Sequence, residues 1–228
     1  MGAGREDLRG EARPVKLRFV SAGAAQAAVR ALAAREGAEV EGHFGAVGAM
    51  LEKFDAGEPC DIVILTRKQV DALAAAGSVL AQSVTDLGAV PTSIAVRSSD
   101  SAPSVTGAET LRAALLAADA IYFPDPAKAT AGIHFDKVLR ELGIRDRVES
   151  RIRTFPNGAT AMRAMAEAGG HPIGCTQATE IAATPGVRLV APLPPGFDLV
   201  TVYSGAVAGR AADRDAAARF LARLRGTL

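Results

Sequence analysis

The sequence predicts an α/β fold in which two lobes, each with a mixed, mainly parallel sheet and flanking helices, face a ligand cleft. Short apolar segments typical of strands alternate with longer segments that have the periodicity of helices, as in βαβ units. The run at residues 61–65 is almost continuously apolar, which is typical of a central parallel strand. Turns of small residues follow strands in both halves of the chain, and ligands in open α/β sheets bind at the carboxyl ends of strands. We therefore expect these turns to face the cleft.

The first third of the chain contains three predicted strand–helix units. The alanine-rich segment after the first strand has good helix formers and stops at Gly37, and Gly77 ends the third helix in the same way. Strands are predicted at residues 15–20, 40–44 and 61–65, and helices at 24–35, 49–54 and 68–76.

The same alternation continues after Pro91. Asp125 and Pro126 end a short apolar strand, and a helical pattern begins at Gly132. Strands are predicted at residues 93–97, 120–123, 172–175, 187–190 and 199–207, and helices at 108–118, 132–142, 158–168, 179–183 and 213–224.

The composition is that of a globular protein without a nucleic-acid partner. The 228 residues are 49% hydrophobic and 22% charged, and a net charge of +1 lacks the basic surplus that phosphate contacts need. Aromatic residues make up only 4%, which disfavours stacking platforms for single-stranded nucleic acid. No run of about eighteen apolar residues occurs, so no direct membrane insertion is expected.

The first fourteen residues are polar and charged, without the apolar core of a secretion signal. The sequence as it stands therefore predicts a cytoplasmic protein. A periplasmic location requires that a signal peptide was removed or lies upstream of this start.

Motifs for metals, cofactors and covalent catalysis are missing from the sequence. Cys60 and Cys175 lie far apart without metal-ligand spacing and are expected to be small buried residues, and the three histidines are dispersed. No phosphate loop, dinucleotide fingerprint or serine nucleophile elbow is found. We expect no metal and no cofactor, and the hydrolase, kinase and dehydrogenase classes are excluded.

Three turns of small residues connect a strand to a helix and suggest a site for a small anion. A helix start leaves backbone N–H groups unpaired, and these attract an anion without a charged side chain. Thr130, Ala131 and Gly132 are the strongest candidates, and Ser21 is expected to contact the anion while it caps a helix. The turns lie at residues 21–25, 44–49 and 123–135.

Further polar side chains are candidates for the same site. Thr176 and Gln177 follow a buried strand, and they either face the cleft or cap the next helix. Arg97 ends a strand near the expected crossover between the lobes, where its guanidinium either forks onto a carboxylate or stays solvated. Tyr203, one of only two tyrosines, needs a partner for its hydroxyl if it is buried.

Seven segments, in this order along the chain, resemble the molybdate-binding protein family, which supplies ABC transporters with oxyanions. They lie at residues 15–23, 44–49, 58–65, 125–126, 131–135, 173–176 and 201–204. The resemblance implies the type II periplasmic-binding-protein fold. It places residues 1–91 and 204–228 in a first, discontinuous lobe, and residues 92–203 in a second lobe that includes the crossover strands.

The resemblance also implies a set of ligand contacts. It places Gly23 and Val47 where the family offers serine hydroxyls, Ala131 and Thr176 where it offers backbone amides, and Tyr203 where it offers a hydroxyl. The implied partners are a small anion and an ABC transporter permease.

The same scaffold is similar to that of aconitate isomerase, which moves a double bond in a tricarboxylate without a cofactor. Such chemistry needs clamps on the carboxylates and a base for a carbon-bound proton. His134 and Asp125 are candidate bases, although a hydrogen-bonded helix histidine and a turn aspartate are their commoner roles. A solute-binding protein that captures a small oxyanion or carboxylate is the leading hypothesis. A cofactor-free isomerase of a di- or tricarboxylate is the second, and a cytoplasmic anion sensor the third.

Overall fold

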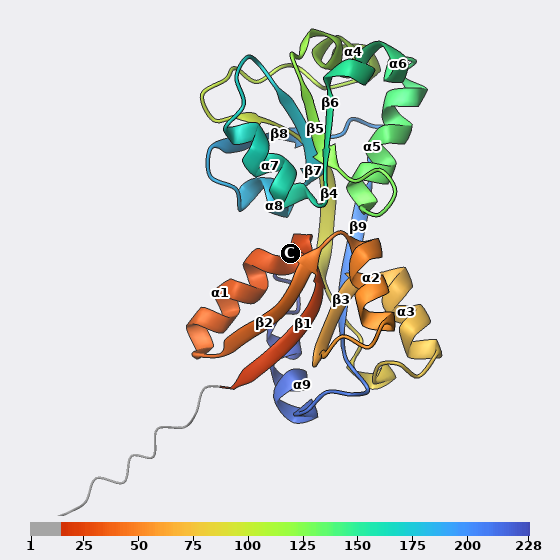
Figure 1. Cartoon of the computed structure of the whole chain (residues 1–228), viewed down its shortest axis with the longest axis vertical. Helices are drawn as coiled ribbons and strands as arrows, with labels where there is room; N and C mark the ends of the chain where they lie inside the picture. Colours follow the sequence, from red (N-terminus) through yellow and green to blue (C-terminus); the bar gives the residue numbers. More distant parts are fainter. Residues whose placement is uncertain (1–14) are drawn as a thin grey trace, which may run out of the picture.

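The computed structural model describes residues 15–228, which form two lobes joined by two long strands (Figure 1). The N-terminal segment, in which the sequence shows no secretion signal, lies outside the described residues. Strand order is β2-β1-β3-β9-β4-β7-β5-β6, with β8 on β4, so one mixed set of strands runs through both lobes. The predicted mixed α/β architecture is confirmed.

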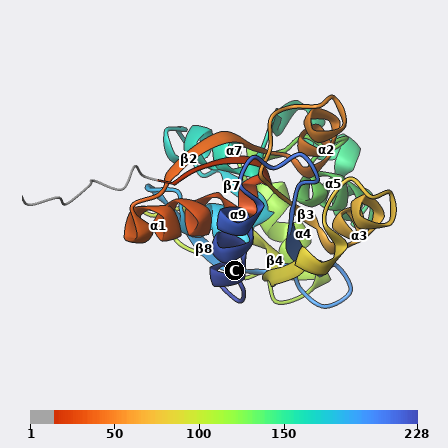
Figure 2. The same ribbon diagram turned by 90° about the horizontal axis from the view of Figure 1, so that it is seen from below.

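In the first lobe, β1 lies between β2 and β3 and is parallel to both, while β9 is antiparallel to β3. Helices α1 and α9 lie together on one side of the strands, and α2 and α3 lie on the other (Figure 2). The elements are β1 Lys16–Ala22, η1 Gly23–Ala25, α1 Gln26–Glu36, β2 Glu39–Gly45, α2 Val47–Asp55, β3 Ile62–Thr66, α3 Arg67–Ala75, η2 Ala81–Ser83, β9 Val200–Val207 and α9 Arg214–Arg223.

In the second lobe, β5 lies between β6 and β7 and is parallel to both, while β7 and β8 are antiparallel to β4. The elements are β4 Thr85–Arg97, α4 Ala108–Ala117, β5 Ile121–Pro124, α5 Thr130–Glu141, α6 Arg145–Val148, η3 Glu149–Arg151, β6 Ile152–Phe155, α7 Gly158–Ala166, β7 Ile173–Gln177, α8 Ala178–Ala182 and β8 Val187–Pro192.

The long strand β4 belongs to both lobes. Up to Pro91, which is opposite Val200, it pairs with β9. From Thr92, which is opposite Gln177, it pairs with β7, and from Ser93 onward it also pairs with β8 on its other side. We propose that the lobes divide at this change of partner, where β4 and β9 run side by side between them (Figure 1).

Each lobe has a core of its own. In the first lobe Phe19 packs edge-on against Phe220, with ring centroids 5.7 Å apart, and in the second Phe123 packs edge-on against Phe135 at 5.3 Å. Cys60 and Cys175 are free and buried, as predicted. Burial raises the pKa of the Cys60 thiol to about 12, so this sulfur is a packing group and not a nucleophile.

No helix within residues 15–228 is long and apolar enough to cross a membrane.

Candidate functional site

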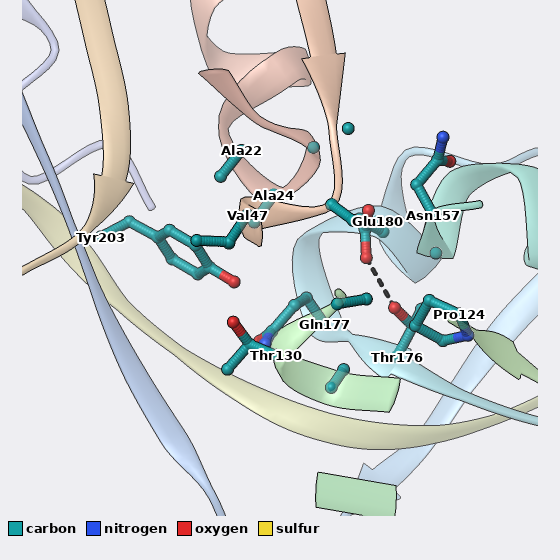
Figure 3. A pocket seen from close by; sticks show the side chains of 16 residues that line it. Ala22, Ala24, Val47, Pro124, Thr130, Asn157, Thr176, Gln177, Glu180 and Tyr203 are labelled. Carbon is teal, nitrogen blue, oxygen red and sulfur yellow. Dashed lines mark hydrogen bonds between the residues drawn. The ribbon is translucent and has the colours of Figure 1, made fainter. Parts of the chain in front are cut away.

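A small pocket lies between the two lobes, at the ends of strands from both. Its volume is about 20 Å³, which is room for about one water molecule. The lobes are closed over it, because the Gly48 amide donates to the Lys128 carbonyl at 2.9 Å and the Lys128 ammonium pairs with Glu52 at 2.7 Å. The lining residues are Ala22, Gly23, Ala24, Gly45, Ala46, Val47, Pro124, Ala129, Thr130, Ala131, Asn157, Gly158, Thr176, Gln177, Glu180 and Tyr203 (Figure 3).

Helices from both lobes begin at this pocket, and α2, α5 and α8 lack a side-chain cap. Helices α2 and α5 start after Ala46 and Ala129, which make no capping hydrogen bond. Alanine is a poor N-cap, so the first N–H groups of these helices have no side-chain acceptor. Helix α7 differs, because the Asn157 side chain accepts from the Thr160 amide at 2.9 Å. The Gly48 amide of α2 already donates to the Lys128 carbonyl, so the other first amides of the uncapped helices, above all those at the start of α5, supply donors for an acceptor in the pocket.

Two polar side chains complete the donor set. The Tyr203 hydroxyl points into the pocket (Figure 3), and burial, followed by the charge of nearby Glu180, raises its pKa, so it stays a neutral donor. Gln177 is only 3% exposed, and neither its amide nitrogen nor its amide oxygen has a hydrogen-bond partner among residues 15–228. A buried polar group left unpaired costs about 1–3 kcal/mol. Gln177 is therefore a group that a ligand would satisfy.

A buried carboxyl group, that of Glu180, also lines the pocket. The Thr176 hydroxyl donates to it at 2.6 Å (Figure 3), and no cation within residues 15–228 forms an ion pair with it. Burial raises the pKa of Glu180, while the Thr176 hydroxyl and the backbone amides of Ala159, Gln177 and Gly158 act in the opposite direction. Burial outweighs these donors, so the carboxyl takes up a proton more readily than an exposed glutamate.

Glycines from both lobes make the space for this carboxyl. A Cβ atom at Gly158 would lie 2.0 Å from Oε2 of Glu180 and 2.0 Å from Oγ1 of Thr176. A Cβ atom at Gly23 would lie 2.6 Å from Oε1 of Glu180. The Glu180 carboxyl therefore occupies the space that a side chain at position 23 would need.

The pocket brings together seven of the ten ligand-binding candidates from the sequence: Gly23, Val47, Thr130, Ala131, Thr176, Gln177 and Tyr203. It does not include Ser21, which is fully buried and whose hydroxyl donates to the Ala22 carbonyl at 3.0 Å. Gly132 lies against the preceding loop, since a Cβ atom there would be 2.2 Å from the Pro124 carbonyl oxygen.

The third residue outside the pocket is Arg97, at the end of β4. Its guanidinium does fork onto a carboxylate, but that carboxylate is Asp100, with both N–O distances 2.8 Å. The carbonyls of Ala168 and Gly170 accept its remaining donors. The Arg97 guanidinium thus links two loops of the second lobe through these hydrogen bonds.

The two candidate bases from the sequence also lie outside the pocket lining. Asp125 accepts from the Ala127 amide at 2.7 Å and closes the turn before α5. A ring nitrogen of His134 lies 2.7 Å from the Phe197 carbonyl oxygen, and the ring lines a separate groove. Both residues have the commoner structural roles that the sequence also allowed.

Sequence reasoning missed Asn157, Gly158 and Glu180. The available signal was that Thr176, near the end of β7, and Glu180, in the first turn of α8, are only four residues apart across the strand-to-helix turn. No cluster of three or more His, Cys, Asp or Glu suited to a metal occurs in the described part of the chain.

Comparison with known proteins identifies the family. Residues 17–227 match the model of the bacterial extracellular solute-binding proteins, and the chain belongs to this family. A curated relative, the aconitate isomerase of a Pseudomonas species, is 27% identical over 165 residues. That match spans 72% of this chain and 61% of the length of the relative.

Solved structures agree on the fold. The periplasmic molybdate-binding protein of Azotobacter vinelandii has a TM-score of 0.71 at 20% identity, over 92% of this chain and 93% of that one. The sulfate-binding protein of Mycobacterium tuberculosis has a TM-score of 0.64 at 17% identity, over 92% and 81%. The substrate-binding domain of a putative molybdenum ABC transporter from Clostridium difficile scores 0.63 at 17% identity, over 92% of each chain. The predicted periplasmic-binding-protein fold and family resemblance are confirmed.

Proposed function

We propose that this protein captures a small anion in the interlobe pocket and delivers it, outside the cytoplasm, to the permease of an ABC transporter. The observation that carries the proposal is a closed pocket in which uncapped helix starts, the Tyr203 hydroxyl and the unpartnered Gln177 amide come together. Family membership and the molybdate- and sulfate-binding structural relatives are consistent with an anion.

The charge of the ligand follows from the chemistry of the lining. None of the described residues that line the pocket is Lys, Arg or His, so neutral dipoles do the binding. Backbone N–H groups at helix starts favour negative charge and provide donors in fixed directions. We therefore propose an oxygen-rich anion that accepts several hydrogen bonds at once.

A thermal-shift panel of sulfate, phosphate, molybdate, acetate and trans-aconitate tests this proposal. An anion present at a hundred times its Kd adds about 2.7 kcal/mol to folding stability, which raises the Tm of a protein of this size by about 5–10 °C. Gln177→Ala should lose at least half of this shift, because it removes a donor inside the pocket. The matched control, Gln69→Ala on α3, should keep the full shift. Equal, small shifts for all anions and both variants would refute anion capture.

A second candidate function is isomerisation of an unsaturated carboxylate, and the buried Glu180 carboxyl favours it. An ionised carboxylate with a raised pKa can take a proton from carbon and return it to another carbon of the same substrate, which moves a double bond without redox change. The similarity to aconitate isomerase is consistent with this chemistry. In this function Glu180, and not His134 or Asp125, is the base.

Incubation with trans-aconitate, followed by NMR, tests the isomerase. An active protein should produce the isomer, and in D₂O it should exchange one carbon-bound proton. Glu180→Gln should abolish turnover, whereas His134→Gln should retain it. Binding of trans-aconitate without turnover or exchange would leave anion capture as the function.

A further inference from the structure

The position of Glu180 creates a charge conflict inside a pocket that otherwise suits an anion. The carboxyl is 7% exposed and lies among the same lining residues as Tyr203 and Gln177. If it is ionised when an anion arrives, two negative groups share a closed cavity without a lining cation. Like charges at such short range disfavour each other strongly in a poorly solvated site.

One proton between the two groups removes this conflict. We propose that Glu180 and the bound anion share a proton in a hydrogen bond, so that the pocket takes up a proton together with its ligand and prefers singly charged anions to dianions. This inference rests on the proposed anion capture, and it names Glu180 as the residue that sets specificity.

The surroundings of the carboxyl fix its position relative to the ligand. The absence of side chains at Gly158 and Gly23 leaves the space that the Glu180 carboxyl fills. The Thr176 hydroxyl donates to Oε2 of this carboxyl at 2.6 Å. Oε1 lies on the side of Gly23, where the first turn of the other lobe meets the pocket. The carboxyl is thus fixed across the lobe boundary and contributes an oxygen on which the proton can reside.

Few other ionisable groups face Glu180. Tyr203 approaches from β9 and stays neutral. Arg30 on α1 and Arg163 on α7 line an adjoining groove on the outer side of Glu180, but they do not line the pocket. No acidic or basic side chain on η1 or α8, other than Glu180 itself, lines either cavity. Titration of ligand binding between pH 5 and 9 therefore reports on Glu180 and on the anion itself.

Sulfate is the decisive probe, because it remains a dianion throughout this range and cannot supply the proton itself. Its Kd should rise with pH above the pKa of Glu180, by up to about tenfold per pH unit. Calorimetry in two buffers of different ionisation enthalpy should show uptake of up to one proton per sulfate. As pH rises from 5 to 9, acetate should lose less affinity than sulfate, because an ionised Glu180 repels a singly charged anion less than a dianion.

Glu180→Gln isolates the titration from the shape of the pocket. The amide keeps a donor of the same size but cannot ionise, so sulfate binding should become independent of pH and proton uptake should vanish. Thr176→Val should keep the pH dependence of sulfate binding but move it to higher pH. Loss of a donor to the charged carboxylate raises the pKa of Glu180, so the decline of affinity should begin at higher pH. Glu167→Gln, an exposed glutamate at the end of α7, should match wild type.

The outcomes separate this inference from the proposed function. Sulfate binding that is equally strong at all pH values in wild type, or pH-dependent in Glu180→Gln, overturns the shared proton and leaves anion capture intact. The absence of binding by any anion of the panel to any variant overturns anion capture as well. If Glu180→Gln does not fold, the shift in Thr176→Val decides.

Discussion

Gly158→Ala is expected to abolish tight anion binding, with a loss of at least tenfold in affinity. The new methyl group has no space, because it would lie 2.0 Å from both Glu180 Oε2 and Thr176 Oγ1. To make room, the Glu180 carboxyl must leave its position in the pocket, and the hydrogen bond from Thr176 must break. Overpacking of this kind also costs about 1–3 kcal/mol of folding stability. Calorimetric titration and thermal unfolding measure both effects.

Gly169→Ala is the matched control for this variant. It adds the same methyl group in the same lobe, but at a position where a Cβ atom meets no atom within 4 Å. Affinity and Tm should both remain at wild-type values. Unchanged anion affinity in Gly158→Ala would contradict the placement of the binding site at Glu180.

Asp61→Ala is expected to cause a large loss of folding stability, about 3 kcal/mol. The Asp61 side chain is only 3% exposed and accepts two bonds from the Arg18 guanidinium at 3.0 Å, as well as bonds from the backbone amides of Arg18 and Ala212. Removal of one partner of a buried ion pair costs about 3–5 kcal/mol, and the lower value applies because a third of Arg18 remains exposed. The Tm should fall by about 6–12 °C.

The Asp61 contribution should also depend on pH. Burial tends to raise the pKa of Asp61, but the Arg18 side chain and the two backbone amides outweigh it and hold the pKa below its usual range. A carboxyl with a lowered folded pKa stabilises the protein above the unfolded pKa of about 3.9 and loses this effect as pH falls through the folded value. The Tm difference between wild type and Asp61→Asn should therefore shrink below about pH 4.

An exposed aspartate provides the comparison. Asp71 pairs with Arg67 on the surface of α3, where Arg67 also contacts Asp86. Asp71→Ala should change stability by less than about 0.5 kcal/mol. A similar cost for Asp61→Ala and Asp71→Ala would show that the buried network has no special role in stability.

The elements with strong periodicity were predictable from the sequence, and those without it were not. Strand β6 was missed because Arg153 and Thr154 are exposed on an edge strand and break the apolar pattern. The first half of β4 was missed because Gly88 and Pro91 interrupt it, although both are tolerated where the strand pairs irregularly or changes partner. The short helix α6 has a single buried residue and therefore no periodic signal.

The candidate site was predictable where the backbone determines it and not where distant residues meet. Turns of small residues pointed to Thr130 and Ala131 because helix starts supply donors in any sequence context, and the family resemblance pointed to Val47. Nothing local marks Glu180 as buried, since the space for its carboxyl comes from Gly23 and Gly158 on other segments. The prediction that Arg97 is a ligand contact was wrong for a similar reason. The pattern of strands does not show that Asp100 binds the Arg97 guanidinium.

The unpaired amide of Gln177 has a consequence for the proposed delivery of an anion to a transporter. In the closed form with an empty pocket, the two amide atoms have no protein partner, which costs about 1–3 kcal/mol for each group that no trapped water satisfies. Closure without cargo is thus penalised by roughly one to several powers of ten in population. If the proposed permease recognises only the closed form, it would bind protein that holds a ligand far more often than empty protein, and few transport cycles would run without a ligand.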